Sequence, residues 1–174
     1  MSPIAHAGIG LLGWQVADRK KTLGTLFLYV FAANFADIDF LFALVFGPHS
    51  LFAHQYYTHN VVFILAGCGL LALALPDRRS RWGLVATGLT HLPLDVIVVD
   101  TVAPIGIRMF YPLSDKLYNV GLFPFLERGP WRVLFSLRNA LVLGLEFAIF
   151  VLPILIIFRR SLAAELRRSE FRRW

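Results

Sequence analysis

Apolar segments long enough to cross a membrane constrain this chain more than any other feature. Residues 22–47 and 132–158 each exceed the roughly 20 residues that span a bilayer core as a helix. Hydrophobic residues make up 57% of the 174 residues and charged residues only 16%, and the mean hydropathy is +0.66. Soluble proteins are only about 45–50% apolar. The sequence therefore predicts an integral membrane protein that is all-α and forms one domain.

About five helices follow from the apolar segments and the residues that interrupt them. We expect them at 3–17, 22–47, 59–75, 82–102 and 132–158. Pro48 would end the second helix, Thr58 would cap the third, and Pro93 would kink the fourth. Residues 103–131, with four prolines, read as a long loop, and residues 159–174 as a basic tail that is amphipathic or disordered.

Basic residues are distributed unevenly between the two sides of this helical bundle. The first connection, the third connection and the tail carry three, three and six of the 17 Lys and Arg residues, and the other side carries five. Cytoplasmic segments of membrane proteins hold such an excess. We therefore expect the N-terminus outside, a membrane-embedded domain over 1–158 and a cytoplasmic tail over 159–174. Because most basic residues flank apolar segments, the net charge of +6 does not indicate a nucleic-acid partner.

Seven side chains of metal-ligand type fall at one depth of the predicted bundle, in its outer half. A charged residue inside a bilayer costs about 2.5–3.5 kcal/mol on insertion scales, and a bound cation offsets several such residues at once. Nitrogen and oxygen ligands without sulfur suit Zn²⁺, with Mn²⁺ or Fe²⁺ as alternatives. Seven ligands exceed the need of one tetrahedral ion, which favours two ions. The seven are His6, Asp37, Asp39, His54, His59, His91 and Asp95.

The spacing of these residues indicates which of them share an ion. His91 and Asp95 are four residues apart and lie on one face of a helix. Asp37 and Asp39 are about 200° apart around a regular helix, so both face one ion only if the helix is distorted. Otherwise one is a ligand and the other orients a histidine. Glu146, in an apolar helix, either pairs with Arg138 or an internal helix face, or reaches the site.

The order of these residues resembles the YdjM-like family of membrane-bound metal-dependent hydrolases, over most of residues 1–115. It also looks, more distantly, like the metal ligands of zinc-dependent phospholipase C and P1-type nucleases. The residues that carry the resemblance are His6, Asp37-Ile-Asp39, His54-x3-Thr58-His59, His91-x3-Asp95, Pro104-x-Gly106 and Tyr111-Pro112. The family pattern has arginine and serine where this chain has Gln55 and Asn60. These departures leave open whether Arg108 takes the place of that arginine.

The resemblance implies a hydrolase that cleaves a phosphoester. A site at the outer leaflet of the inner membrane would meet a phospholipid or a lipid-linked substrate. Asp37, Asp39 or Asp100 would accept the proton of the attacking water, and Arg108 with Lys116 would attract the anionic head group. The alternative is a metal-binding membrane protein or transporter without hydrolase activity.

Overall fold

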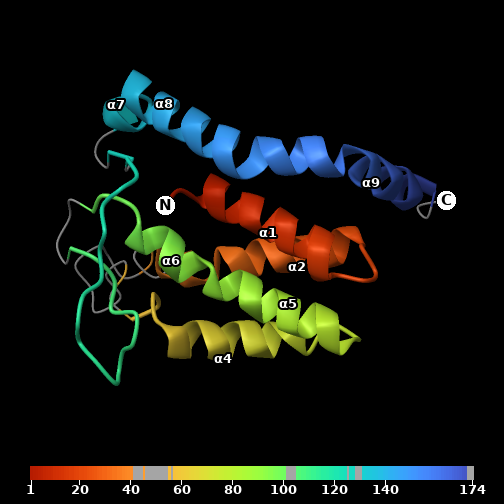
Figure 1. Cartoon of the computed structure of the whole chain (residues 1–174), viewed down its shortest axis with the longest axis horizontal. Helices are drawn as coiled ribbons and strands as arrows, with labels where there is room; N and C mark the ends of the chain where they lie inside the picture. The colour runs from red at the N-terminus through yellow and green to blue at the C-terminus, as the bar shows by residue number, and fades with distance from the viewer. Residues whose placement is uncertain are drawn as a thin grey trace.

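The computed structural model describes residues 1–40, 45, 55, 57–100, 105–124, 126–127 and 131–171, and every regular element among them is helical. An all-α fold is thereby confirmed. The elements are α1 (Pro3–Ala17), α2 (Leu23–Ala33), the 3-10 helix η1 (Phe35–Ile38), α4 (Val61–Ala72), α5 (Arg78–Leu89), α6 (His91–Val96), α7 (Trp131–Leu134), α8 (Leu137–Glu146), the π-helix η2 (Phe147–Val151) and α9 (Leu152–Phe171) (Figure 1).

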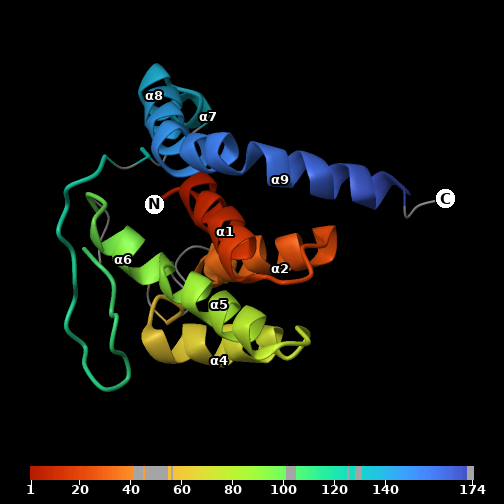
Figure 2. The same ribbon diagram turned by 45° about the vertical axis from the view of Figure 1, so that its right-hand side comes forward.

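Helix α1 lies at the centre of the bundle and has the bounds that the sequence predicts. It packs against α2 and α5, and also against η2 and α9. In Figures 1 and 2, α8 and α9 run along one side of it, while α5 and α4 lie on the other. Gly10 permits the contact with α2, because a Cβ atom there would lie 2.6 Å from the Cα atom of Val30. Trp14 is buried, and its indole N–H donates to Thr25 at 3.0 Å.

The continuous helix predicted over 22–47 is wrong, because α2 gives way to η1 at Asn34. The side-chain amide of Asn34 donates to the carbonyl of Val30 at 2.8 Å, and such a bond competes with the helical ladder. The tighter winding of η1 then sets the directions of Asp37 and Asp39. The predicted end of this helix lies outside the described residues.

The third predicted helix begins later than expected. Helix α4 starts at Val61, and its cap is Asn60, whose side-chain oxygen accepts the N–H of Phe63 at 2.8 Å. Thr58 is therefore not the cap, and its hydroxyl instead contacts the side chains of Asp39 and His59.

The fourth predicted helix, 82–102, is two shorter helices that start earlier. Asp77 caps α5 by accepting the N–H of Ser80 at 3.0 Å, and hydrogen bonds from the hydroxyl and N–H of Ser80 lower the pKa of this partly exposed carboxyl. Pro93 has no N–H to donate to Leu89, so the chain breaks into α5 and α6 instead of only kinking. Helix α6 ends at Val96, short of the predicted residue 102.

The last predicted helix starts at Leu137 instead of 132 and extends into the predicted tail, because α8, η2 and α9 follow one another without a break. Its segment Leu137–Glu165 has 29 residues, and the most apolar 18-residue stretch within it is 17% buried inside the protein. Among the described residues it is the one helix long and apolar enough to cross a membrane; α2 and α4 are apolar but shorter. A five-span bundle with its N-terminus outside remains a prediction.

The two ends of the bundle are chemically different. The connections at 18–22 and 73–77 and the end of α9 all point toward the right of Figures 1 and 2. The starts of α1 and α4 and the whole of α6 lie toward the opposite end, which the segment 105–124 crosses. Main-chain hydrogen bonds hold this segment to α6 and α4, among them Val120 to Val96 at 2.7 Å and Val61 to Met109 at 2.9 Å.

Candidate metal centre

Four parts of the chain bring six of the seven predicted ligands together at the end of the bundle that 105–124 crosses. Helix α1 supplies a histidine one turn from its start, η1 and the residue after it supply two aspartates, the approach to α4 supplies a histidine, and α6 supplies a histidine and an aspartate. All are buried except Asp37, whose side chain is 12% exposed. The six are His6, Asp37, Asp39, His59, His91 and Asp95. The seventh, His54, lies outside the described residues.

The first group that could hold a metal ion is His6, His91 and Asp95, whose ligand atoms all lie within 4.8 Å of one another. The Asp95 carboxylate lies between the two histidines, with Oδ1 3.3 Å from Nε2 of His6 and Oδ2 3.2 Å from Nε2 of His91. The two imidazole rings are stacked, with centroids 3.8 Å apart. The amino group of Met1 also contacts Oδ1 of Asp95. The predicted pairing of His91 with Asp95 on one helix face is present.

The second group is Asp37, His59 and His91, so it shares His91 with the first. The Nε2 atoms of the two histidines face each other at 3.3 Å. Oδ1 of Asp37 lies 3.5 Å from Nε2 of His59 and 3.7 Å from Nε2 of His91. Asp95 reaches this group as well, with Oδ2 3.2 Å from Nε2 of His59. The two groups are therefore contiguous, as neighbouring sites for two ions would be.

The polar atoms of this cluster are suited to binding a divalent cation, because hydrogen bonds within the cluster do not satisfy all of them. Nδ1 of His6 and Oδ2 of Asp37 are buried and have no hydrogen-bond partner among the described residues, and Nε2 of His6 has the 3.3 Å contact with Asp95. A buried polar atom without a partner costs about 1–3 kcal/mol. Facing imidazole nitrogens surrounded by carboxylate oxygens, with no sulfur ligand, match the donor set of Zn²⁺.

Hydrogen bonds outside the cluster fix the orientation of two histidines. Nδ1 of His91 lies 2.8 Å from the carbonyl oxygen of Ala33, which only accepts, so Nδ1 carries the proton and Nε2 is left with a lone pair. Nδ1 of His59 lies 2.9 Å from the hydroxyl of Thr58, and that hydroxyl donates to Asp39 at 2.7 Å. The His59 ring therefore donates from Nδ1 to Thr58 and also presents an unprotonated Nε2.

Asp37, in η1, and Asp39, directly after it, contact opposite sides of the His59 ring. Asp37 turns toward the facing Nε2 atoms, whereas Asp39 lies on the Nδ1 side of His59 at 3.4 Å. Asp39 also accepts the N–H of Gln55 at 2.9 Å. Gln55 has φ +72°, a left-handed conformation that costs a residue other than glycine about 1–3 kcal/mol and clusters at functional sites. Of the alternatives open from spacing, the geometry matches one ligand, Asp37, and one supporting residue, Asp39.

Thr58 and the carbonyl of Ala33 are the site groups that sequence reasoning missed. A hydroxyl residue directly before a candidate metal histidine was the available signal for Thr58, but the same position also suits a helix cap. No side-chain pattern marks the carbonyl of Ala33, because any residue supplies one.

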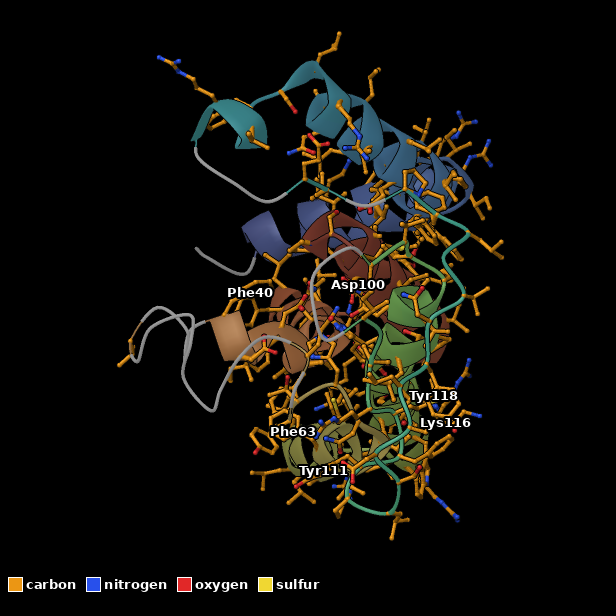
Figure 3. All side chains as sticks on the ribbon, turned by 90° about the vertical axis from the view of Figure 1, so that its left-hand side faces the viewer. Phe40, Phe63, Asp100, Tyr111, Lys116 and Tyr118 are labelled. Carbon is orange, nitrogen blue, oxygen red and sulfur yellow. The ribbon has the colours of Figure 1, made fainter. Side chains whose placement is uncertain are left out.

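The two remaining predicted catalytic residues, Asp100 and Arg108, belong to neither ligand group. Asp100 accepts the N–H of Gly106 at 2.9 Å, and Nη1 of Arg108 lies 3.4 Å from Asp115. Figure 3 looks onto this end of the bundle and shows Asp100 near its middle, with Lys116 and Tyr118 side by side on the crossing segment. Nζ of Lys116 lies 5.3 Å from the centre of the Tyr118 ring.

Comparison with known proteins identifies the family. None of the curated proteins and none of the solved structures that were compared matches the chain. One family model, described as YdjM inner membrane protein, matches residues 1–164, which include all seven predicted ligands and Glu146. The description supports a location in the inner membrane, and the match covers most of the 174 residues. The chain therefore belongs to the family of YdjM inner membrane proteins.

Proposed function

We propose that this protein is a membrane-embedded, metal-dependent hydrolase that cleaves a phosphoester of a phospholipid or a lipid-linked substrate. The observation that carries the proposal is the pair of contiguous ligand groups that share His91. His6 and Asp95 would hold one divalent ion, and Asp37 and His59 the second, with Zn²⁺ as the preferred metal. His91 has one lone pair, on Nε2, and would therefore complete only one of the two sites. Such ions lower the pKa of a bound water toward about 7 and neutralise charge on phosphoryl oxygens.

Side chains near the ligand groups would accept a proton, orient a histidine and attract the phosphate. Asp37 is the best placed proton acceptor, because Oδ1 turns to the histidines while Oδ2 has no hydrogen-bond partner among the described residues. Asp39 keeps His59 in the tautomer that offers Nε2 to an ion. Arg108 would attract the phosphate, since its partner Asp115 is 78% exposed and an exposed ion pair is weak enough to exchange. Asp100, by binding the N–H of Gly106, would hold the segment that presents Arg108.

The outer leaflet is the proposed place of reaction. The connections with basic residues lie at one end of the bundle and the ligand groups toward the other. If the basic end faces the cytoplasm, as such ends usually do, the centre lies near the outer head groups. A substrate lipid could then bind there without leaving the membrane.

A metal-binding protein without hydrolase activity is the second candidate, and burial favours it. His6, His59, His91, Asp39 and Asp95 are each at most 6% exposed, so a substrate would have to approach past Asp37.

The test is turnover by the purified full chain in phospholipid vesicles. We expect release of a phosphorylated head group or phosphate, loss of release after chelation, and recovery when Zn²⁺ is returned. A protein that holds stoichiometric metal but releases nothing from phospholipid or lipid-linked phosphoesters supports the second candidate. A protein that binds no metal contradicts both.

A further inference from the structure

Glu146 is a buried carboxylate in the long helix that is apolar enough to cross a membrane. It lies within the candidate membrane span Leu137–Glu165, and only 1% of its surface is exposed. A carboxylate in such a segment is costly unless another group binds it. Glu146 is therefore held in place by a specific contact.

Glu146 is held by hydrogen bonds from Ser2, the residue directly before α1. The N–H of Ser2 lies 3.2 Å from both carboxylate oxygens of Glu146, and its hydroxyl donates to Oε2. Ser2 is also the N-cap of α1, because its side-chain oxygen accepts the N–H of Ile4 at 3.2 Å. Glu146 thus fixes the first turn of α1 to the long apolar helix.

The same turn carries His6. Its N–H donates to the carbonyl of Ser2 at 3.4 Å, so the backbone of His6 moves with Ser2. His91 is oriented by a carbonyl and His59 by a hydroxyl, whereas the ring of His6 contacts other members of the cluster, Oδ1 of Asp95 at 3.3 Å and the stacked ring of His91. The position of His6 therefore depends on where α1 begins.

Helix α1 makes a second close contact with this helix, next to the contact between Ser2 and Glu146. The helix changes to π winding directly after Glu146, in η2, and π-bulges are frequent at functional sites. Gly8 of α1 fits against this segment, since a Cβ atom there would lie 2.4 Å from the carbonyl oxygen of Phe150. Two adjoining contacts thus lock α1 onto α8 and η2.

We propose that Glu146 is a positioning residue for the metal centre, which holds His6 in place through Ser2. The long apolar helix would then serve the centre as well as the membrane. The inference rests on the proposed metal binding but not on hydrolysis. It predicts that Glu146 matters for the ion held by His6 and Asp95 and not for the ion held by Asp37 and His59.

The experiment is a Co²⁺ titration of the full chain in detergent, followed by visible absorption and by competition with a Zn²⁺-binding dye. Wild-type protein should show two ions. Glu146→Gln removes the charge at nearly constant volume. It should weaken one ion about 10- to 100-fold, which is the usual effect of losing a supporting group. The other ion should keep its affinity and absorption bands, whereas a general loss of structure would weaken both.

Glu127→Gln is the matched control, because Glu127 pairs with Arg138 and is 46% exposed. It should leave both ions unchanged. If Glu146→Gln does not fold, Ser2→Ala replaces it and should weaken the same ion to a smaller extent. Wild-type affinity for both ions in the folded Glu146 variant, or failing that in Ser2→Ala, overturns the inference. Two bound ions without phosphoester turnover would overturn the proposed hydrolysis and leave this inference intact.

Discussion

Replacing Thr58 by valine tests whether the tautomer of His59 controls metal binding. Valine matches the shape of threonine but has no hydroxyl. In the structure that hydroxyl donates to Asp39 at 2.7 Å and lies 2.9 Å from Nδ1 of His59. Thr58→Val therefore removes the group that holds the proton on Nδ1 and leaves the buried space filled.

The size of the effect follows from what remains around His59. A hydrogen bond to a charged group contributes about 1.5–3 kcal/mol. Asp39 keeps the N–H of Gln55 at 2.9 Å, and its Oδ2 is already 3.4 Å from Nδ1 of His59. A small movement lets Asp39 accept the Nδ1 proton directly, so the loss should fall at the lower limit. We expect Zn²⁺ affinity to fall about tenfold, or about 1.4 kcal/mol.

The assay is competition for Zn²⁺ between the detergent-solubilised protein and a fluorescent chelator. Thr58→Ser is the matched control, since it keeps the hydroxyl and should bind within about twofold of wild type. Asp39→Asn should cost more than Thr58→Val, because the amide cannot replace the carboxylate as acceptor for both donors. Unchanged Zn²⁺ affinity in a folded Thr58→Val protein would refute the assignment of Asp39 and Thr58 as supports of His59.

Three further predictions concern the centre, the packing and the topology. Substitutions His91→Ala and Asp95→Asn should each abolish phosphoester turnover, and the double variant should lose little more, because residues that act as a unit are not additive; additive losses would argue against a shared site. Gly10→Ala should lower the free energy of unfolding by about 1–3 kcal/mol through overpacking, whereas Gly69→Ala, with nothing within 4 Å of its added methyl group, should not lower it; thermal unfolding in detergent measures both. Reporter fusions should be active in the periplasm within 105–124 and in the cytoplasm after the C-terminus, and the reverse pattern would move the centre to the inner face.

The sequence predicted the elements whose ends are determined locally. Helix α1 was predicted to the residue, because Pro3 suits the first turn and polar residues follow Ala17. The break at Asn34 was missed, since a side chain that bonds to its own helix leaves no mark on an apolar pattern. The basic residues after Asp77 suggested a connection between helices, but Asp77 is the N-cap of α5 and these residues form its first turn.

The candidate site was predicted in composition but not in arrangement. Residue type and apolar context were enough to select six side chains that lie together, and a four-residue spacing was enough to pair His91 with Asp95. The division between Asp37 and Asp39 depends on a 3-10 turn and on the left-handed backbone of Gln55, which are tertiary outcomes. The sequence left open whether Glu146 pairs with Arg138 or an internal helix face, or reaches the site. In the structure Glu146 contacts Ser2 at the start of α1 and not a candidate ligand, and Arg138 pairs with Glu127.

The contact between Ser2 and Glu146 joins residues 144 positions apart in the chain, and this separation matters during biosynthesis. A ribosome adds about 5–20 residues per second, so roughly 7–30 s pass between the synthesis of the two partners. If Glu146 positions His6 as proposed, the group Asp37, His59 and His91 would be available once α6 has been made, whereas His6 would be fixed in place only after α8 has been made. A nascent chain would then pass through a stage with one complete ligand group, and a second ion would be bound firmly only near the end of translation.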